Sequence, residues 1–474
     1  MSFPMNPLNQ YILLIFMFIL LITGCREKPP TEAPAKPNVV ILLTDDQGYG
    51  DLSCQGSPTI LTPNVDRLAS EGVRITSFYS AGTVCAPSRR GLMTGRYAAR
   101  IKAEGHEIER TVLPDGKVQP GGMSGEEITL AELFKSRAYA TACLGKWHLG
   151  MGEGSHPNEQ GFDYFYGTSS SNDHFPQNGF RYNYEGFKQA TNEHFNLPLY
   201  RQSDTLEIPA KQELFTKRYT AEAIRWIGDH AHEPFFLYLA YNMPHVPTFP
   251  SEAFAGKSYA GQFGDVIEEI DWSVGEIRRA LETHGLDQNT IVVYSSDNGP
   301  WRIYHELGGS QGPFRNGKGT SWEGAFRVPG IFWWPGHFEP AIVPEPVSSL
   351  DLFATFSAML DEPLPDDRLY DSHNLLPMLL EGKKNPGSSF YYFSERNHEL
   401  WAVRQGIYKL HVKTVDYHRG PVQTEEPPLL FNLANDPAET HNVADEFPDI
   451  ARALLDQIEA MNRQLEHPFI QGAK

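Results

Sequence analysis

A cysteine followed by a proline and two arginines is the segment of this chain best suited to chemistry. Residues Cys85–Arg96 spell Cys-Ala-Pro-Ser-Arg-Arg-Gly-Leu-Met-Thr-Gly-Arg. Pro87 favours the first turn of a helix, where its missing N–H is not needed. Cys85 would then lie at a helix N-terminus, whose free N–H groups and positive dipole end attract anions. Arg89 follows one turn later and can return to the same point. A lone cysteine is more often a small buried hydrophobe, but this segment predicts a nucleophile beside an anion site.

Two pairs of oxygen-bearing side chains each follow a continuous apolar run. The pairs and their preceding runs are Asp45-Asp46 after Asn38–Thr44 and Asp297-Asn298 after Thr290–Tyr294. Such runs indicate buried strands of a parallel sheet, and α/β sheets bind their ligands at the carboxyl ends of the strands. A polar turn or a helix cap is the alternative. Together the four side chains favour a hard divalent cation, Ca²⁺ or Mg²⁺.

Basic side chains follow two further predicted strands. Lys146 and His148 come after Tyr139–Leu144, and their alternation on an extended chain would point both in the same direction. His245 comes after Pro234–Tyr241, between two prolines. A single lysine or histidine is usually a surface residue or a satisfied core residue. Several of them at strand ends instead indicate an anion-binding pocket.

The elements that must position these residues predict an α/β fold with a mostly parallel sheet between helices. The polar segment from Tyr164 to Pro176 is expected to face the substrate, with a solvated surface loop as the alternative. Gly261–Leu281 has the apolar spacing of an amphipathic helix. Its acidic residues are expected on the solvated face; they are Asp265, Glu268, Glu269 and Asp271. From about Asn385 the pattern changes to short alternating strands, which predicts a smaller C-terminal subdomain with an antiparallel sheet.

The size and charge of the chain limit its partners. Its 474 residues suffice for one large domain and a smaller one, and its formal net charge is −19. A chain this acidic should not bind nucleic acid through bulk electrostatics, and an anionic substrate must be attracted by a few local cations. Two of its four cysteines, Cys54 and Cys143, either form a disulfide or remain separate buried thiols.

The N-terminal segment predicts export. Tyr11–Ile22 is an apolar run of signal-peptide length, and Thr23-Gly24-Cys25 resembles the cleavage box of a bacterial lipoprotein. Cys25 would then be lipidated and anchor the protein to a membrane, either in the periplasm or at the cell surface. A plain secretory signal or an unprocessed anchor is the alternative. The predicted organisation is a signal peptide at 1–24, a proline-rich tether at 25–36, a catalytic domain at 37–384 and the C-terminal subdomain at 385–474.

The segment from Cys85 to Arg96, with Leu92, Thr94 and Gly95 inside it, resembles the signature of type I sulfatases of the arylsulfatase A and N-acetylgalactosamine-6-sulfatase kind. Further matching landmarks lie in order along the chain; they are Lys146-x-His148, His156-Pro157, Gly161-Phe162-Asp163 and a run from Lys318 to Pro329. The resemblance spans residues 38–444. It implies the alkaline-phosphatase-like α/β fold and the hydrolysis of sulfate esters.

The resemblance also implies roles for individual residues. A maturing enzyme would oxidise Cys85 to formylglycine, whose aldehyde hydrate is the nucleophile, and Arg89 would hold that hydrate. Lys146, His245 and Lys318 would bind sulfate, with His245 the acid that protonates the leaving oxygen and His148 the base. The implied Ca²⁺ ligands are Asp45, Asp46, Asp297 and Asn298.

The expected substrate is a sulfated sugar or polysaccharide, attacked from the chain end at a galactose or N-acetylgalactosamine sulfate. This expectation rests on the resemblance alone. A phosphonate or phosphate monoester hydrolase of the same superfamily is one alternative. A non-enzymatic glycan-binding lipoprotein is an alternative of a different class, although every implied ligand residue is present, and a purely structural surface protein is a third.

Overall fold

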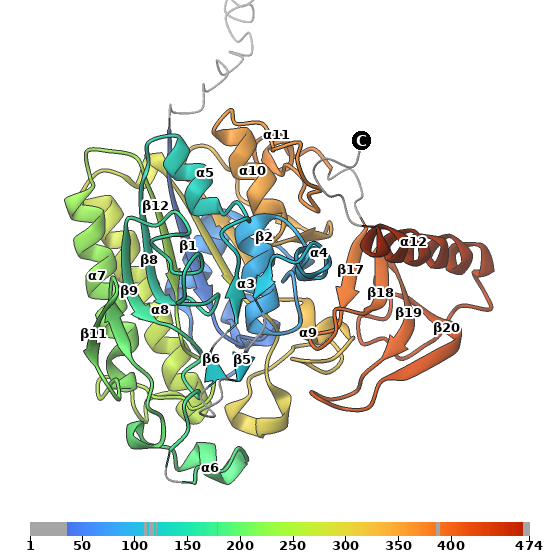
Figure 1. Ribbon diagram of the computed structural model, residues 1–474, viewed down its shortest axis with the longest axis horizontal. Helices are drawn as coiled ribbons and strands as arrows, with labels where there is room; N and C mark the ends of the chain where they lie inside the picture. The colour runs from blue at the N-terminus through green and yellow to red at the C-terminus, as the bar shows by residue number, and fades with distance from the viewer. Residues whose placement is uncertain are drawn as a thin grey trace, which may run out of the picture. The chain divides into compact units, whose positions relative to one another are not determined.

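A ten-stranded sheet forms the centre of the catalytic part of the protein (Figure 1). The computed structural model describes residues 36–467 except 109–110, 113–117, 120, 178 and 385–388. From one edge to the other the strands are β11 (Asp204–Glu207), β10 (Leu199–Arg201), β9 (Tyr164–Thr168), β8 (Ala140–Lys146), β12 (Phe235–Ala240), β1 (Asn38–Thr44), β13 (Thr290–Ser296), β14 (Gly330–Trp333), β2 (Val73–Ile75) and β15 (Ala341–Val343).

The five neighbouring strands from β9 to β13 are parallel, as is the pair β2 and β15, whereas β10, β11 and β14 pair antiparallel with their neighbours. This arrangement confirms the predicted mixed, mostly parallel sheet. Because the side chains of a strand alternate between its two faces, β1 contributes to two apolar cores. Val39, Ile41 and Leu43 belong to one core, and Val40 and Leu42 to the other.

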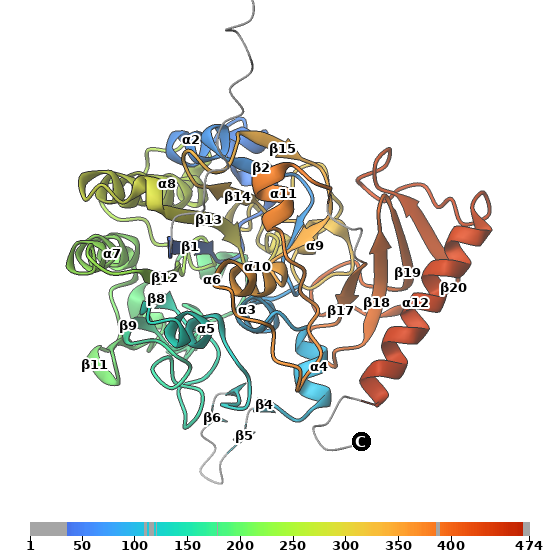
Figure 2. The same cartoon turned by 90° about the horizontal axis from the view of Figure 1, so that it is seen from above.

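Helices cover both faces of the sheet (Figure 2). The face of Val40 and Leu42 is packed by α2 (Pro63–Glu71), α7 (Phe215–Asp229) and α8 (Gly261–Thr283). The face of Val39 and Ile41 is packed by α3 (Cys85–Thr94), α5 (Leu130–Ser136), α10 (Asp351–Met359) and α11 (Leu376–Glu381). Shorter elements complete this part; they are α4 (Ala98–Ala103), α6 (Tyr184–Lys188), α9 (Glu323–Phe326), β3 (Phe78–Tyr79), β4 (Glu107–Ile108), β5 (Thr111–Val112), β6 (Val118–Gln119), β7 (Gly122–Met123) and β16 (Val347–Ser348).

The acidic residues of α8 correct one prediction. Asp265, Glu269 and Asp271 are buried, and only Glu268 is partly exposed. The carboxylate of Asp271 accepts hydrogen bonds from the backbone N–H groups of Asn64 and Val65, which begin α2. These acids therefore satisfy free N–H groups of other segments, and they do not form a solvated face.

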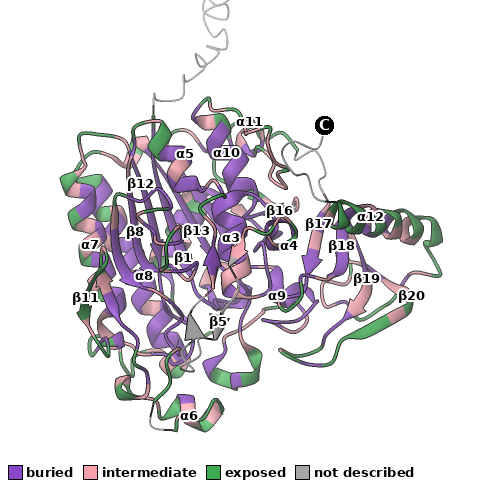
Figure 3. Cartoon of the chain, viewed as in Figure 1, coloured by how far each residue is buried: buried purple, intermediate pink, exposed green. Residues whose placement is uncertain are grey.

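The C-terminal subdomain is a four-stranded antiparallel sheet with one long helix on it. Its strands are β17 (Phe390–Phe393), β18 (Leu400–Gln405), β19 (Tyr408–Thr414) and β20 (Gln423–Asn432), and its helix is α12 (Pro448–Glu466). Side chains of the sheet and of α12 share an apolar core with Tyr79, Tyr97 and Phe326 of the catalytic part. The chain from Lys36 onward is one compact unit, and Figure 3 shows the central strands buried and much of α12 exposed.

Two further predictions concern the cysteines and the N-terminal segment. Cys54 and Cys143 are both free thiols, so the disulfide alternative does not hold. The predicted signal peptide, Cys25 and nearly all of the tether lie outside the described residues. No helix within the described ranges has both the length and the apolar character that crossing a bilayer requires.

Candidate active site

Four adjacent parallel strands end at one edge of the sheet and deliver the predicted site residues. In spatial order these strands are β8, β12, β1 and β13. Lys146 is the last residue of β8, and His245 follows β12 after a short turn. Asp45 and Asp46 come directly after β1. The pair Asp297-Asn298 comes directly after β13. The carboxyl edge of the parallel sheet thus collects residues from four distant parts of the chain.

Cys85 is the first residue of α3, as the position of Pro87 predicted. Its side chain is buried, and its Sγ atom lies 3.2 Å from Oδ1 of Asp45 and 3.4 Å from Nζ of Lys318. Burial, together with the negative charges of Asp297 and Asp45, raises the pKa of the thiol well above its ordinary value. An unmodified Cys85 is therefore a protonated and poor nucleophile.

Two lysines flank the cysteine. Nζ of Lys146 donates to Asp45 at 2.5 Å, and Nζ of Lys318 donates to both oxygens of Asp46 at 2.7 and 2.8 Å. Burial opposes the charge of both lysines, but Asp45 and Asp46 outweigh it and raise the pKa of each. Both side chains therefore remain cationic beside the Sγ atom, where an anionic group would bind.

The second carboxylate pair converges on the first. Nδ2 of Asn298 donates to Asp46 at 2.7 Å, and the backbone N–H of Asp46 donates to Asp297 at 3.2 Å. Arg89 returns to this point as its spacing predicted, with Nε 2.9 Å and Nη2 2.8 Å from Oδ2 of Asp297. Asp46, Asp297 and Asn298 are therefore neighbours at one site, and Asp45 lies beside Asp46 there.

The donor set fits a hard cation. Three carboxylates and one side-chain amide offer oxygen atoms, which are the ligand type that Ca²⁺ prefers. Asp45 and Asp46 also form a group with Cys85 and His245 in which one ligand atom of each residue lies within 4.8 Å of the others. Within the described part of the chain, Oδ1 of Asn298 is buried and accepts no hydrogen bond. Burial raises the pKa of Asp46 despite the nearby Lys318, so the carboxylates are not fully compensated by the lysines. A cation bound between Asp46 and Asn298 would satisfy both groups.

His245 is held beside the same carboxylates. Its Nδ1 atom donates to the backbone oxygen of Val246 at 2.5 Å, which leaves Nε2 facing the site. Nε2 lies 3.3 Å from Oγ of Ser171 and 3.6 Å from Asp46. Burial and the charge of Lys318 lower the pKa of His245 well below its ordinary value. The ring is therefore neutral until an anion enters the site.

His148 reaches the pocket by a different route from the one its sequence predicted. Strand β8 ends at Lys146, so the alternation of an extended chain does not continue to residue 148. His148 instead has a positive φ of +61°, and its ring packs edge-on against His174 at 5.3 Å between centroids. Its side chain lines the same pocket as Ala86 and Pro87, which follow Cys85 directly.

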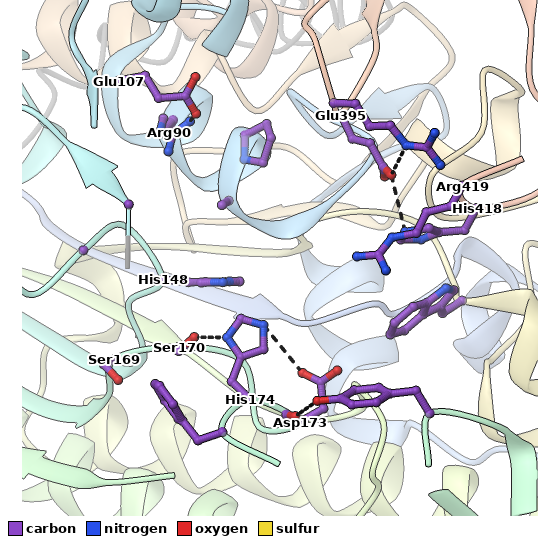
Figure 4. Close-up of a pocket in the computed structure, with 18 of the residues that line it drawn as sticks. Arg90, Glu107, His148, Ser169, Ser170, Asp173, His174, Glu395, His418 and Arg419 are labelled. Atoms are coloured by element: carbon purple, nitrogen blue, oxygen red, sulfur yellow. Dashed lines mark hydrogen bonds and ion pairs between the residues drawn. The ribbon is translucent and has the colours of Figure 1, made fainter. Parts of the chain in front are cut away.

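A pocket of about 1010 Å³ opens above this cluster (Figure 4). The polar segment predicted to face the substrate does line it, through Ser169, Ser170, Asp173 and His174. A second wall of the pocket, which no motif in the sequence predicts, comes from Trp301 and from loops of the C-terminal subdomain. That wall comprises Glu395, Arg396, His398, His418 and Arg419. These residues belong to none of the motifs, and only the packing of the two sheets brings them here.

The sulfatase family model matches residues 37–362, and the model for the C-terminal region of aryl-sulfatase matches residues 385–471. This chain belongs to the sulfatase family. Human arylsulfatase A is 36% identical to this sulfatase over 460 residues, which cover 91% of this chain and 88% of the relative. Mouse N-acetylgalactosamine-6-sulfatase is 37% identical over 476 residues, covering 91% and 87%. The sulfatase is accordingly a sulfuric ester hydrolase.

Solved structures show the same fold. The PsFucS1 sulfatase from Pseudoalteromonas sp. superposes with a TM-score of 0.80 at 26% identity, covering 98% of this sulfatase and 96% of that chain. The protein Ps i-CgsB, solved in complex with k-i-k-neocarrahexaose, superposes with a TM-score of 0.73 at 28% identity, covering 92% and 96%. A phosphonate monoester hydrolase of Agrobacterium radiobacter shares the fold at 18% identity and a TM-score of 0.60, covering 91% and 96%.

Proposed function

We propose that this sulfatase removes sulfate from sulfated carbohydrate, with formylglycine at residue 85 and Ca²⁺ at the carboxylate cluster. The observation that carries the proposal is the position of Sγ of Cys85. It lies within 3.4 Å of both a carboxylate and a lysine, beside a pocket large enough for a sugar. A thiol with a raised pKa is ill suited to attack sulfur. Conversion of Cys85 to formylglycine would place a suitable nucleophile at the same position.

Ca²⁺ would be held by the four oxygen ligands that follow β1 and β13, namely Asp45, Asp46, Asp297 and Asn298. When bound, such an ion withdraws charge from a sulfate oxygen and from the nucleophile. The formylglycine hydrate supplies the attacking oxygen at position 85. Arg89, fixed by its two contacts with Asp297, offsets part of the negative charge around that hydrate.

The remaining residues act on the sulfate and on the leaving group. Lys318 lies beside residue 85 and Lys146 is bonded to Asp45, which also contacts that residue. Both lysines would donate hydrogen bonds to sulfate oxygens. Nε2 of His245 faces the site, and the negative charge of a bound sulfate favours its protonation. The protonated ring then gives its proton to the sugar oxygen as the S–O bond breaks. Overall, water supplies the oxygen that the released sulfate carries away, and the sugar leaves as an alcohol.

The pocket favours a sugar as the alcohol part of the ester. Its volume of about 1010 Å³ is at the upper end of the range for small-molecule sites, and histidines, serines and Trp301 line it. One relative is named N-acetylgalactosamine-6-sulfatase, and one structural neighbour was solved with a carbohydrate. We therefore propose a galactose or N-acetylgalactosamine sulfate at the end of a chain as the substrate.

The export signal is part of the same proposal. Cys25 would carry lipid and hold the enzyme at a membrane, with access to polysaccharide outside the cytoplasm. A Cys25→Ala variant should move from the membrane fraction to the soluble fraction of the cell extract or medium. Unchanged membrane association of that variant would contradict lipid anchoring through this residue.

Three measurements test the catalytic proposal. Peptide mass spectrometry of active enzyme should show residue 85 as formylglycine, the product of a maturing enzyme in the producing cell. Chelation should abolish activity, and Ca²⁺ should restore it better than Mg²⁺. A panel of sugar sulfates, 4-nitrophenyl sulfate and a phosphonate monoester should show sulfate esters turned over fastest. Full activity with an intact Cys85 thiol, or faster turnover of the phosphonate ester, would overturn the proposal.

A further inference from the structure

The pocket wall contributed by the C-terminal subdomain carries positive charge. Arg396 lies in the turn between β17 and β18, and His418 and Arg419 lie in the turn after β19. All three residues line the pocket, together with Glu395. Figure 4 shows Glu395, His418 and Arg419 on this wall. None of them contacts Cys85, so this wall faces the part of the ligand beyond the sulfate group.

One of these charges is compensated within the protein. Oε1 of Glu395 lies 3.8 Å from Nε of Arg396 and 3.4 Å from Nε2 of His418. Elsewhere in the pocket, Arg90 forms an ion pair with Glu107. Burial and the positive charges of Lys318 and Arg419 lower the pKa of His418 to about 3, so that ring is neutral.

Arg419 differs from its neighbours. Its side chain is exposed in the pocket, and its guanidinium forms no hydrogen bond or ion pair with any residue that the structure describes. The charge of Arg419 acts on nearby Glu395, but no carboxylate of the described residues forms an ion pair with it, although the chain has a net charge of −19. Arginine binds sulfate and carboxylate through two parallel hydrogen bonds, so the group offers a ready site for an anion.

The position of Arg419 is also well fixed. Its φ is +61°, a left-handed conformation that is unfavourable for an arginine and persists only where the surrounding structure holds it. The preceding residue, His418, stacks on Trp301 at 5.2 Å, and Nζ of Lys318 lies 4.4 Å from the centre of the same indole ring. The turn that carries Arg419 therefore packs on the indole ring of Trp301, which also contacts Lys318.

We propose that Arg419 is a specificity-determining residue that binds a second negative charge on the substrate. The inference rests on the proposed function, because the first negative charge is the sulfate at residue 85. The second charge is an anionic group elsewhere on the ligand, which is either another sulfate on the same sugar or the carboxylate of a neighbouring uronate. The substrate is then a polyanionic carbohydrate, and a sugar with a single sulfate is a poorer one.

The experiment compares selectivity between matched probes. The singly charged probe is N-acetylgalactosamine 6-sulfate. The two doubly charged probes are N-acetylgalactosamine 4,6-disulfate and N-acetylgalactosamine 6-sulfate linked to glucuronate. Values of kcat/KM are measured for wild type, Arg419→Ala, Arg419→Lys and Arg279→Ala at two salt concentrations. Arg279 is an exposed arginine on α8, so its removal changes the net charge equally without touching the pocket.

Wild type should prefer one doubly charged probe over the singly charged probe, and the preferred probe identifies the source of the second charge. Arg419→Ala should reduce that preference by about 10–100-fold, as expected for loss of a charge-assisted hydrogen bond. Arg419→Lys should restore part of the preference and Arg279→Ala should keep all of it. Added salt should weaken the preference in wild type and Arg279→Ala, and have little effect in Arg419→Ala.

Two results would overturn the inference. One is a wild type with no preference for either doubly charged probe. The other is a parallel loss on all three probes in Arg419→Ala, which would assign Arg419 a structural role. Hydrolysis of 4-nitrophenyl sulfate by wild type reports on the sulfatase chemistry independently. The inference about Arg419 can therefore fail while the proposed function stands.

Discussion

Two buried clusters of charge in this protein are built from the same kinds of side chain, yet they serve different ends. The catalytic cluster comprises Asp45, Asp46, Asp297, Arg89, Lys146 and Lys318. The interface cluster joins the catalytic part to the C-terminal sheet and comprises Glu323, Glu439, Lys409, Arg404 and His411. In the interface cluster, Nζ of Lys409 lies 3.1 Å from Glu323 and 2.9 Å from Glu439. Two tyrosine hydroxyls, those of Tyr79 and Tyr392, also donate to Glu323.

The pKa values of one carboxyl group in each cluster, Glu323 and Asp46, differ in the direction of their shift. Burial raises the pKa of Glu323, but Lys409, Arg404 and Arg327 outweigh it and lower the value to about 2. In the catalytic cluster burial prevails, and the pKa of Asp46 is raised even with Lys318 in contact. A cluster whose carboxylates are fully compensated by cations stabilises the fold. A cluster beside a pocket whose carboxylates are not fully compensated can still bind a ligand or an ion.

The largest expected effect concerns the nucleophile position. Cys85→Ala should lower sulfatase activity by about 10⁴-fold or more, because no hydrate can form there. Its thermal stability should stay close to that of wild type. The matched control is Cys143→Ala on β8, which removes a buried thiol from the apolar core. That variant should keep its kcat while losing stability, and a comparable activity loss in both variants would contradict a catalytic role for Cys85.

The two histidines beside the catalytic cluster, His245 and His148, should differ in how far their effect on the rate depends on the leaving group. His245→Ala should slow sugar sulfates by about 10²–10⁴-fold and slow 4-nitrophenyl sulfate much less, because a good leaving group needs little protonation. His148→Ala should impair both substrates similarly, since release of sulfate from residue 85 follows departure of the alcohol. Steady-state kinetics of both variants on both substrates make the comparison. Equal losses for His245→Ala on the two substrates would assign it to sulfate binding.

The interface cluster should respond in stability. Glu323→Gln should lower the free energy of unfolding by about 3–5 kcal/mol at pH 7, because Arg404 loses its carboxylate partner and Lys409 keeps only Glu439. The pKa of Glu323 in the folded protein, about 2, lies below its ordinary value of 4.5. Its stabilising contribution is therefore complete above about pH 4.5 and is lost as the pH falls toward 2. Denaturant titrations of wild type and variant should converge over that range. An exposed carboxylate on α12, Glu459, supplies the control Glu459→Gln, which should have little effect.

The smallest effect is expected at a helix cap. Asp271→Ala should lower the free energy of unfolding by about 1–2 kcal/mol, because the backbone N–H groups of Asn64 and Val65 lose their acceptor. Burial raises the pKa of Asp271 to about 6, so its contribution to stability declines as the pH rises from about 4 to 6. The free energy of unfolding of the variant, measured by urea denaturation, should not show this dependence on pH. The control is Glu282→Ala, on the exposed side of α8, whose free energy of unfolding should match that of wild type within about 0.5 kcal/mol.

The sequence was sufficient for those parts of the site where local pattern and topology coincide. Continuous apolar runs marked β1 and β13, and the end of each run located Asp45 and Asp297 at one sheet edge. Pro87 likewise marked the start of α3. The prediction worked because parallel strands place their carboxyl ends together whatever the intervening chain does.

The sequence was insufficient where a residue's partner is distant and unmarked. The acids of α8 have the spacing of a solvated face, and nothing local shows that Asp271 caps another helix. Arg419 and His418 sit in an ordinary turn, and they reach the pocket only because the C-terminal sheet packs beside it. The prediction for His148 requires the extended chain of β8 to continue to residue 148, but the strand ends at Lys146.

The attachment of the segment around Lys318 to the C-terminal sheet sets an order of events during synthesis. The backbone N–H of Glu323 donates to Glu439, which is 116 residues later in the chain, and a Cβ on Gly319 would collide with His418. The contacts that hold the segment of Lys318 are therefore complete only when almost the whole chain has left the ribosome. Cys85 is buried in the finished protein, so the modifying enzyme that we propose would have to reach it before these contacts form. Under that proposal, the last strands to be synthesised set the time limit for the modification of residue 85.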